Sequence, residues 1–245
     1  MQEVTLVIPC YNEEKRLPEA AILEYLSSHS EVAVLFVNDG STDHTSQRIE
    51  NLARKAPGQI TCLQLSKNMG KAEAVRQGIL KACESKHGTW LGYWDADLST
   101  PLAEVDRLLG HATNEVKMLM GSRVKRLGAS VQRHAWRHIG GRIMATLLSI
   151  LLRLPVYDTQ CGAKLIRRDI IETVFSKPFL SAWLFDVEIL FRLGFLCPTL
   201  GRDNSIIEVP VATWKDVCGS KLKFQHIVRS LIDIVRLYIS YRLLK

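Results

Sequence analysis

The sequence has no two cysteines spaced as a CxxC motif, although it contains six cysteines in 245 residues. This scatter indicates neither a zinc site nor a disulfide framework, so we expect reduced thiols. The sequence also lacks a run of the roughly 18 apolar residues that a membrane-spanning helix requires. A strand-like VTLVIP stretch begins almost at once, where a secretory signal would need a basic start and a long apolar run. From these absences we predict a cytoplasmic protein.

Acidic residues are absent from Lys117 to Arg153, and this one basic segment carries the excess behind the net charge of +7. Such a balance can indicate nucleic-acid binding, which predicts affinity for DNA or RNA with a steep salt dependence and no metal-dependent turnover. However, no recognisable binding motif accompanies the charge, and aromatic residues make up only 7% of the chain. We therefore expect no nucleic-acid partner, and a basic nucleic-acid-binding protein is the non-enzyme alternative.

The first hundred residues alternate short β-branched runs with longer helical patterns, which is typical of βα units and a mostly parallel sheet. The sequence therefore predicts an α/β fold with helices on both faces of the sheet. We expect strands at Val4 to Ile8, Val32 to Val37, Ile60 to Leu65 and Trp90 to Trp94, and helices at Glu13 to Ser27, Asp43 to Lys55 and Lys71 to Glu84.

The pattern after residue 102 is less regular. We expect a catalytic domain over residues 1–223 and an amphipathic helix over residues 224–245, packed on the domain or at a membrane surface. The further elements expected are helices at Leu102 to Ala112 and Ala182 to Leu193, strands at Met118 to Ser122 and Ile206 to Val211, and a turn entering a strand at Asp158 to Arg167.

Polar residues follow each of the first two strands. Pro9-Cys10-Tyr11-Asn12-Glu13 ends the first strand, and Asn38-Asp39-Gly40-Ser41-Thr42-Asp43 ends the second. Ligands bind at the carboxyl edge of parallel sheets, and we expect these two strand ends to lie side by side. The alternative is local: Asn12 caps the first helix, and Ser41, Thr42 or Asp43 caps the second.

Two further segments favour phosphate and metal binding. Lys71 stands at a helix start, where amides, dipole and ammonium together suit a phosphate, although the GxxxxGK[ST] and GxGxxG fingerprints are both missing. Asp95 and Asp97 are separated by one residue directly after an apolar strand, so their carboxylates repel unless a cation neutralises them. Such oxygen ligands suit Mg²⁺ or Mn²⁺ and leave positions for substrate phosphates. The alternative is a solvated turn.

The motifs PCYNE, VNDGSTD, NMGK, DADLSTP and GSR, in this order between Val4 and about Lys223, resemble the family 2 glycosyltransferases of the GT-A nucleotide-sugar fold. RLPE, DTQCGAKL, FDVE and GSKLK are similar to motifs of the polyprenyl-phosphate sugar synthases, and most of all to those of the dolichyl-phosphate glucosyltransferases. The resemblance implies a metal-dependent, inverting transfer of a hexose from a nucleotide sugar to a polyprenyl phosphate. UDP-glucose is the favoured donor, and GDP-mannose is the other candidate.

The same resemblance implies roles for individual residues. Nucleotide-sugar binding falls to Pro9, Tyr11, Glu13, Val37, Asp39, Lys71, Asp95, Ala96 and Asp97. The metal ligands are Asp95, Asp97 and Ser99, where Ser99 stands at a position often held by Gln in mannose-transferring relatives and water is an alternative third ligand. Acceptor or phosphate binding falls to Arg123, Lys215 and Lys221, and catalytic roles fall to Asp97, Arg123, Asp158 and Lys221. Asp158, Gln160, Asp186 and Glu188 face the sugar and acceptor, unless Asp158 caps a turn and Glu188 pairs with a base.

A lipid acceptor implies a peripheral protein on the cytoplasmic face of a membrane, working alone, with a membrane-embedded partner or as a homodimer. Several basic side chains could meet anionic headgroups, each contributing about 1 kcal/mol at best. They are Arg123, Lys125, Arg126, Arg133, Arg137 and Arg142. Both the apolar helix that follows them and the tail helix could instead pack on the core or form a dimer interface. A soluble saccharide or protein acceptor is the enzymatic alternative.

Overall fold

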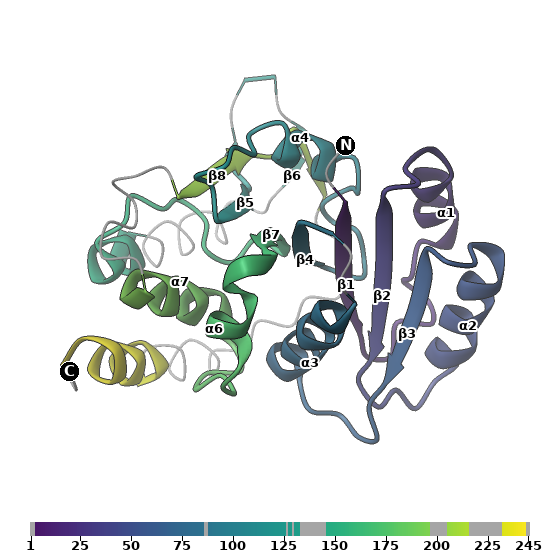
Figure 1. The fold of residues 1–245 in the computed structure, drawn as a ribbon, viewed down its shortest axis with the longest axis horizontal. Helices are drawn as coiled ribbons and strands as arrows, with labels where there is room; N and C mark the ends of the chain where they lie inside the picture. The colour runs from purple at the N-terminus through teal and green to yellow at the C-terminus, as the bar shows by residue number, and fades with distance from the viewer. Residues whose placement is uncertain are drawn as a thin grey trace.

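The computed structural model describes residues 3–85, 88–125, 127–128, 130–132, 146–196, 205–215 and 232–243. These residues form a mixed α/β structure around a seven-stranded sheet of order β3-β2-β1-β4-β7-β5-β8 (Figure 1). Strands β3, β2, β1 and β4 run parallel, β7 runs antiparallel to β4 and β5, and β8 is parallel to β5. The predicted α/β class and mostly parallel sheet are therefore confirmed.

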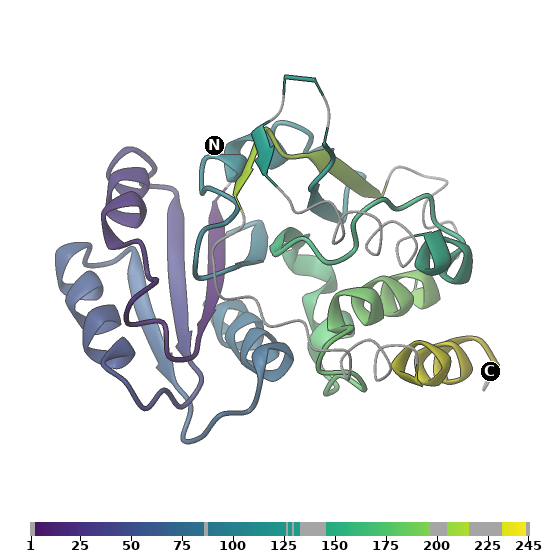
Figure 2. The same cartoon turned by 180° about the vertical axis from the view of Figure 1, so that it is seen from behind.

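The first half of the chain follows the predicted alternation closely. Its elements are β1 (Val4–Cys10), α1 (Glu19–Ser28), β2 (Val32–Asn38), α2 (Thr45–Lys55), β3 (Ile60–Gln64), α3 (Lys71–Glu84) and β4 (Trp90–Trp94). Strands β2 and β4 are apolar over nearly their whole length because they are covered on both faces. Helices α1 and α2 lie on one side of the sheet and α3 on the other (Figure 2).

The second half is built from shorter elements. They are α4 (Glu104–Leu109), β5 (Met118–Ser122), β6 (Ser130–Gln132), β7 (Ala163–Arg167), the 3-10 turn η1 (Arg168–Ile170), α6 (Ile171–Phe175), α7 (Phe185–Leu196), β8 (Ile206–Pro210), β9 (Thr213–Lys215) and the π-helical turn η2 (Ile239–Leu243). Residues 146–152 and 232–238 are also helical. Strands β6 and β9 pair separately from the main sheet.

The core consists of two apolar layers, one on each face of the sheet. Alternate residues of β1 enter different layers: Leu6 packs with α1, α2 and α4, whereas Val7 packs with α3, α6 and α7. Helix α3 approaches the sheet closely at Gly78, where a Cβ atom would lie 2.4 Å from a methyl of Val7. This close approach fixes the start of α3 relative to the ends of β1 and β2.

Two helix starts differ from the prediction. The first helix begins at Glu19 rather than Glu13, because Pro18 disfavours helical geometry in the residue before it and the preceding residues form a turn on the Glu13 carbonyl. Asn12 does not cap a helix, and its φ is +53°. The second helix begins at Thr45, and the Asp43 carboxylate accepts the Thr45 backbone N–H at 3.0 Å. Asp43 thus supplies the capping oxygen from two residues upstream.

The predicted tail helix over residues 224–245 is described only in part. Helical structure covers residues 232–243, while residues 216–231, which include Lys221, lie outside the described residues. Arg126, Arg133, Arg137 and Arg142 of the basic segment also lie outside them. Within the described parts of the chain, no helix combines the length and the apolar character needed to cross a bilayer.

Candidate functional site

The polar ends of β1 and β2 lie side by side, as the sequence predicts. Cys10 at the end of β1 is in register with Asn38 at the end of β2. The loops that follow are tied together: the Thr42 backbone N–H donates to the Asn12 side chain at 2.9 Å, and the Glu13 N–H donates to the Thr45 hydroxyl at 2.8 Å. Asn12 and Thr45 therefore shape the edge of the candidate site from two strands.

Residues expected to surround the base and ribose differ in what they can offer a ligand. Tyr11 is exposed, whereas Val37 is fully buried in β2. Asp39 is also buried, and its two carboxylate oxygens accept the backbone N–H groups of Met69 at 2.6 Å and Gly70 at 2.8 Å. Asp39 thus holds the turn before α3, a structural role that the sequence did not reveal.

The carboxylate pair follows β4 directly. Leu98, in the same turn, has a φ of +46°. Asp97 accepts the Ser99 backbone N–H at 3.0 Å and the Ser99 hydroxyl at 2.8 Å, so Ser99 orients Asp97. Asp95 donates its backbone N–H to the Gly162 carbonyl at 3.0 Å. A Cβ atom on Gly162 would lie 1.9 Å from Asp95 Oδ2, so glycine alone leaves room for this carboxylate.

Lys71, the first residue of α3, contacts Asp95, the first carboxylate of this pair. Its Nζ lies 2.5 Å from Asp95 Oδ1, and both side chains are partly exposed. Burial lowers the pKa of Lys71, but Asp95, Asp186 and Asp97 outweigh it and hold that pKa above its ordinary value. The structure therefore joins the NMGK and DADLSTP segments into one charged cluster.

The donor set around Asp95 and Asp97 suits a hard divalent cation that shares its ligands with a substrate. Among the described residues, no group of three or more His, Cys, Asp or Glu side chains is arranged to hold a metal. Mg²⁺ is typically bound by one or two carboxylates plus substrate phosphates rather than by an all-protein cage. Two carboxylates one residue apart fit that description.

Glu13 and Lys215 both lie near the turn that carries Asp97 and Ser99. Burial raises the pKa of Glu13, Arg16 opposes the rise, and the charge of Asp97 adds to it. Glu13 Oε1 pairs with Arg16 at 2.5 Å, whereas Glu13 Oε2 is buried and has no hydrogen-bond partner among the described residues. Lys215 donates its backbone N–H to the Ser99 carbonyl at 3.0 Å, which brings β9 against the turn that carries Asp97.

Arg123 and Asp158 form a fixed pair at the end of β5. The guanidinium donates two hydrogen bonds to the carboxylate, at 2.6 and 2.8 Å, and the Arg123 backbone N–H donates a third at 3.1 Å. Asp158 also accepts the Gln160 backbone N–H at 3.2 Å, which is the turn-capping alternative. The guanidinium carbon lies 5.5 Å from the Trp214 ring centroid, so Arg123 is held from two sides.

Lys164 of β7 and Asp186 of α7 form a further charged pair, which is buried. Lys164 is fully buried, and its Nζ contacts Asp186 Oδ1 and the Cys161 carbonyl oxygen at 2.5 and 2.6 Å. Tyr93 donates its hydroxyl hydrogen to the same carboxylate. Sequence reasoning singled out Asp186 but missed Lys164 and Tyr93, whose one signal is a polar group within an apolar strand.

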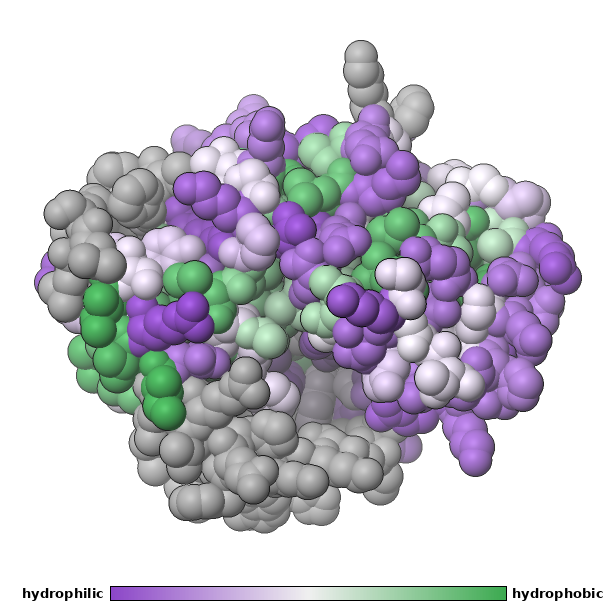
Figure 3. Space-filling model, turned by 90° about the horizontal axis from the view of Figure 1, so that it is seen from below, coloured by the Kyte–Doolittle hydropathy of each residue, from purple (hydrophilic) through white to green (hydrophobic). Residues whose placement is uncertain are grey.

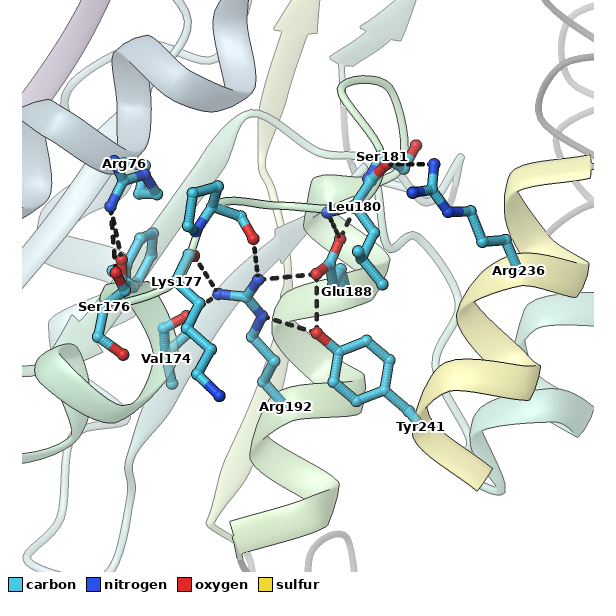
Figure 4. Close-up of polar contacts among 12 residues, drawn as sticks. Arg76, Val174, Ser176, Lys177, Leu180, Ser181, Glu188, Arg192, Arg236 and Tyr241 are labelled. Carbon is cyan, nitrogen blue, oxygen red and sulfur yellow. Dashed lines mark hydrogen bonds and ion pairs between the residues drawn. The ribbon is translucent and has the colours of Figure 1, made fainter. Parts of the chain in front are cut away.

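Glu188 pairs with a base in a network that supports α7 and the C-terminal helix (Figure 4). One carboxylate oxygen binds Arg192 and accepts the Tyr241 hydroxyl, both at 2.8 Å. The other accepts the backbone N–H groups of Leu180 and Ser181. Because both oxygens are engaged in this way, the alternative that Glu188 pairs with a nearby base is confirmed.

The C-terminal helix has two different faces. Its inner face carries the buried Ile234 and Leu237, whereas its outer face exposes Ile232, Val235 and Ile239. Apolar side chains accordingly gather on the surface at the end of the molecule that holds this helix (Figure 3). Leu147 and Ile150 on the helix at 146–152 are also exposed.

Comparisons with known proteins agree on the type of protein. The model of glycosyl transferase family 2 matches residues 5–175. A dolichyl-phosphate beta-glucosyltransferase of Trichomonas vaginalis is 32% identical over 97% of this chain and 71% of its own length. The human protein of that name is 32% identical over 90% of this chain and 70% of its own.

A comparison with solved structures identifies proteins of similar fold. A solved structure of glucosyl-3-phosphoglycerate synthase from Mycobacterium tuberculosis, in complex with Mn²⁺, UDP-glucose and phosphoglyceric acid, matches with a TM-score of 0.70. The match covers 98% of this chain and 79% of that protein, at 15% identity. At this identity the likeness establishes the shared fold, and the predicted GT-A architecture is confirmed.

Proposed function

This chain belongs to glycosyl transferase family 2, and we propose that it transfers glucose from UDP-glucose to a polyprenyl phosphate, with inversion at the anomeric carbon. The observation that carries the proposal is the cluster of Lys71, Asp95 and Asp97, which adjoins the polar ends of β1 and β2. The relatives named dolichyl-phosphate beta-glucosyltransferase support the sugar and the acceptor, because they match nearly the whole chain. GDP-mannose is the alternative donor.

On the donor side, the chain provides groups for the diphosphate. Asp95 and Asp97 hold Mg²⁺ or Mn²⁺, which when bound stabilises the negative charge that develops on the departing nucleoside diphosphate. Lys71 adds an ammonium at the start of α3, where helix amides also favour phosphate. Tyr11 and Glu13 border the space for the base and ribose, next to the loop that Asp39 holds.

On the acceptor side, a phosphate oxygen is the nucleophile and is already anionic at neutral pH. A strong general base is therefore less necessary than in transfer to a sugar hydroxyl. Arg123 is oriented for phosphate binding because Asp158 holds Nε and Nη2, so that Nη1 points away from the pair. Asp158 thus acts through Arg123 in this proposal, and Lys215 and Lys221 are further phosphate ligands.

The lipid part of the acceptor requires contact with a membrane surface. The exposed Ile232, Val235 and Ile239 form an apolar stripe of the kind that lies in the interfacial region of a bilayer. The basic segment between Lys117 and Arg153 adds attraction to anionic headgroups. We propose that the protein lies peripherally at a membrane, on its cytoplasmic face, and the apolar stripe and the basic segment support the membrane contact.

A donor and acceptor screen tests this function. The purified protein is incubated with Mn²⁺, detergent-solubilised polyprenyl phosphate and either UDP-glucose or GDP-mannose, and lipid-linked sugar is measured. We expect product with UDP-glucose and its loss when EDTA is added. Product only with a soluble saccharide or protein acceptor contradicts the lipid acceptor, and salt-sensitive DNA or RNA binding without any transfer contradicts the enzymatic proposal.

A further inference from the structure

The charged pairs around the site differ in exposure. Lys164 and Asp186 are 0% and 8% exposed, and Arg123 and Asp158 are 16% and 9% exposed. Lys71 and Asp95, in contrast, are 44% and 36% exposed. Exposed ion pairs contribute little to stability, corresponding to at most about fivefold in an equilibrium constant. Of these three pairs, Lys71 with Asp95 is the one that a ligand can separate at small cost.

The contacts of Asp95 show what a cation must displace. Lys71 Nζ occupies Oδ1 at 2.5 Å, while Gly162 packs against Oδ2. A divalent cation that binds Asp95 therefore competes with the ammonium for the carboxylate, and the two positive charges repel. The ammonium sits on a flexible four-carbon stem at the start of α3, so it can leave Asp95 without moving the backbone.

We propose that Lys71 is a displaceable counter-ion of Asp95, which couples the binding of a divalent cation to the binding of the donor diphosphate. This inference rests on the proposed function. Without nucleotide, Lys71 neutralises Asp95 and weakens cation binding. With nucleotide, the ammonium moves to the diphosphate and frees Asp95 for the cation. Cation and nucleotide thus each strengthen the binding of the other by the same factor, as linkage requires.

Direct binding measurements separate this role from a simple phosphate contact. Mn²⁺ binding is followed by electron paramagnetic resonance, with and without UDP and with correction for the complex that Mn²⁺ and UDP form in solution. For Lys71→Met we expect Mn²⁺ alone to bind up to about fivefold more tightly than to the unmodified protein, because the positive charge that competes for Asp95 is gone. We also expect UDP to strengthen Mn²⁺ binding by a smaller factor in this variant.

Two further variants serve as controls. Lys71→Arg keeps the charge, so Mn²⁺ alone should bind as weakly as to the unmodified protein. Lys81→Met removes an exposed lysine from the same helix, where Lys81 pairs with Glu84, and should change neither measurement. Circular dichroism checks that each variant folds.

The outcomes distinguish the two proposals. If the unmodified protein shows UDP-dependent Mn²⁺ binding but Lys71→Met binds Mn²⁺ alone no more tightly, the counter-ion role is overturned and the proposed function stands. Weaker UDP binding in Lys71→Met without any gain in Mn²⁺ binding overturns it as well, because Lys71 is then a phosphate ligand only. If the unmodified protein binds neither Mn²⁺ nor UDP, the proposed function itself fails.

Discussion

The two sides of the candidate site use charged residues differently. On the side of β1, β4 and α3, Lys71 and Asp95 are partly exposed and meet each other through a single contact. On the side of β5, β7 and α7, Lys164 is fully buried and Arg123 is 16% exposed, and each makes several hydrogen bonds to protein groups. The charges of the first side are available to a ligand, whereas those of the second are mostly engaged with the protein framework, which holds Arg123 in place for the proposed phosphate contact.

The largest expected effect is on the framework side. Lys164→Met leaves Asp186 buried without its ammonium, so we expect the free energy of unfolding to fall by about 3–5 kcal/mol. Lys71→Met should lower it by no more than about 1 kcal/mol, because its pair is exposed. Chemical denaturation measures both variants. Equal losses would show that the two sides do not differ in this way.

A double variant tests whether the loss of stability in Lys164→Met comes from the unpaired charge of Asp186. Lys164→Met combined with Asp186→Asn removes both charges, and we expect it to recover much of the lost stability because no uncompensated charge remains buried. If the double variant is as unstable as the single one, packing rather than charge explains the role of Lys164.

On the ligand side, the largest effect should fall on activity. Asp97→Asn removes a charge that would hold the metal, and we expect kcat to drop by about a hundredfold or more. The thermal midpoint should change little, because the variant keeps a side-chain oxygen that can accept from Ser99. The transfer assay and thermal unfolding measure the two effects. Unchanged transfer would remove Asp97 from the metal site.

Local sequence patterns predicted the elements that local forces determine. The bounds of Lys71–Glu84 and Trp90–Trp94 match the prediction, because an apolar run or a periodic face defines each one. The first helix was predicted six residues too early, since Asn12 accepts a hydrogen bond from the Thr42 N–H and Glu13 donates one to the Thr45 hydroxyl, and these bonds hold the chain in a turn. No pattern within a single segment reports such contacts between distant residues.

The same distinction applies to the site. Asp95 and Asp97 stand out in the sequence because they are separated by one residue after a strand. The contact between Lys71 and Asp95 joins residues that are far apart in the chain, and so does that between Lys164 and Asp186. Gly162 was missed for a similar reason: its importance comes from the carboxylate that packs against it across two antiparallel strands.

Gly162 lies where the two sides of the site meet, next to Asp95, and a substitution there should have an effect of intermediate size. In Gly162→Ala, the new methyl group would collide with the Asp95 carboxylate, which must swing away and leave Lys71. We expect activity to fall about tenfold or more, while stability falls by about 1 kcal/mol or less because the displaced group is the partly exposed end of a side chain. Gly110→Ala, at a glycine with a helical φ of −59°, is the matched control. A large loss of stability with normal specific activity would contradict this assignment.

The smallest expected effect concerns pH and Glu13. Burial raises the pKa of this carboxyl above its ordinary value of 4.5, and Asp97 contributes to the rise although Arg16 opposes it. The folded state therefore binds the proton more tightly than the unfolded chain, so stability from this group is present below pH 4.5 and is lost as pH rises through the folded pKa. Glu13→Gln cannot ionise and should be slightly more stable than the unmodified protein near pH 7, with the difference shrinking toward acid pH. Denaturation in EDTA at several pH values measures this difference, and a gap that stays constant with pH would mean that the ionisation of Glu13 does not oppose folding.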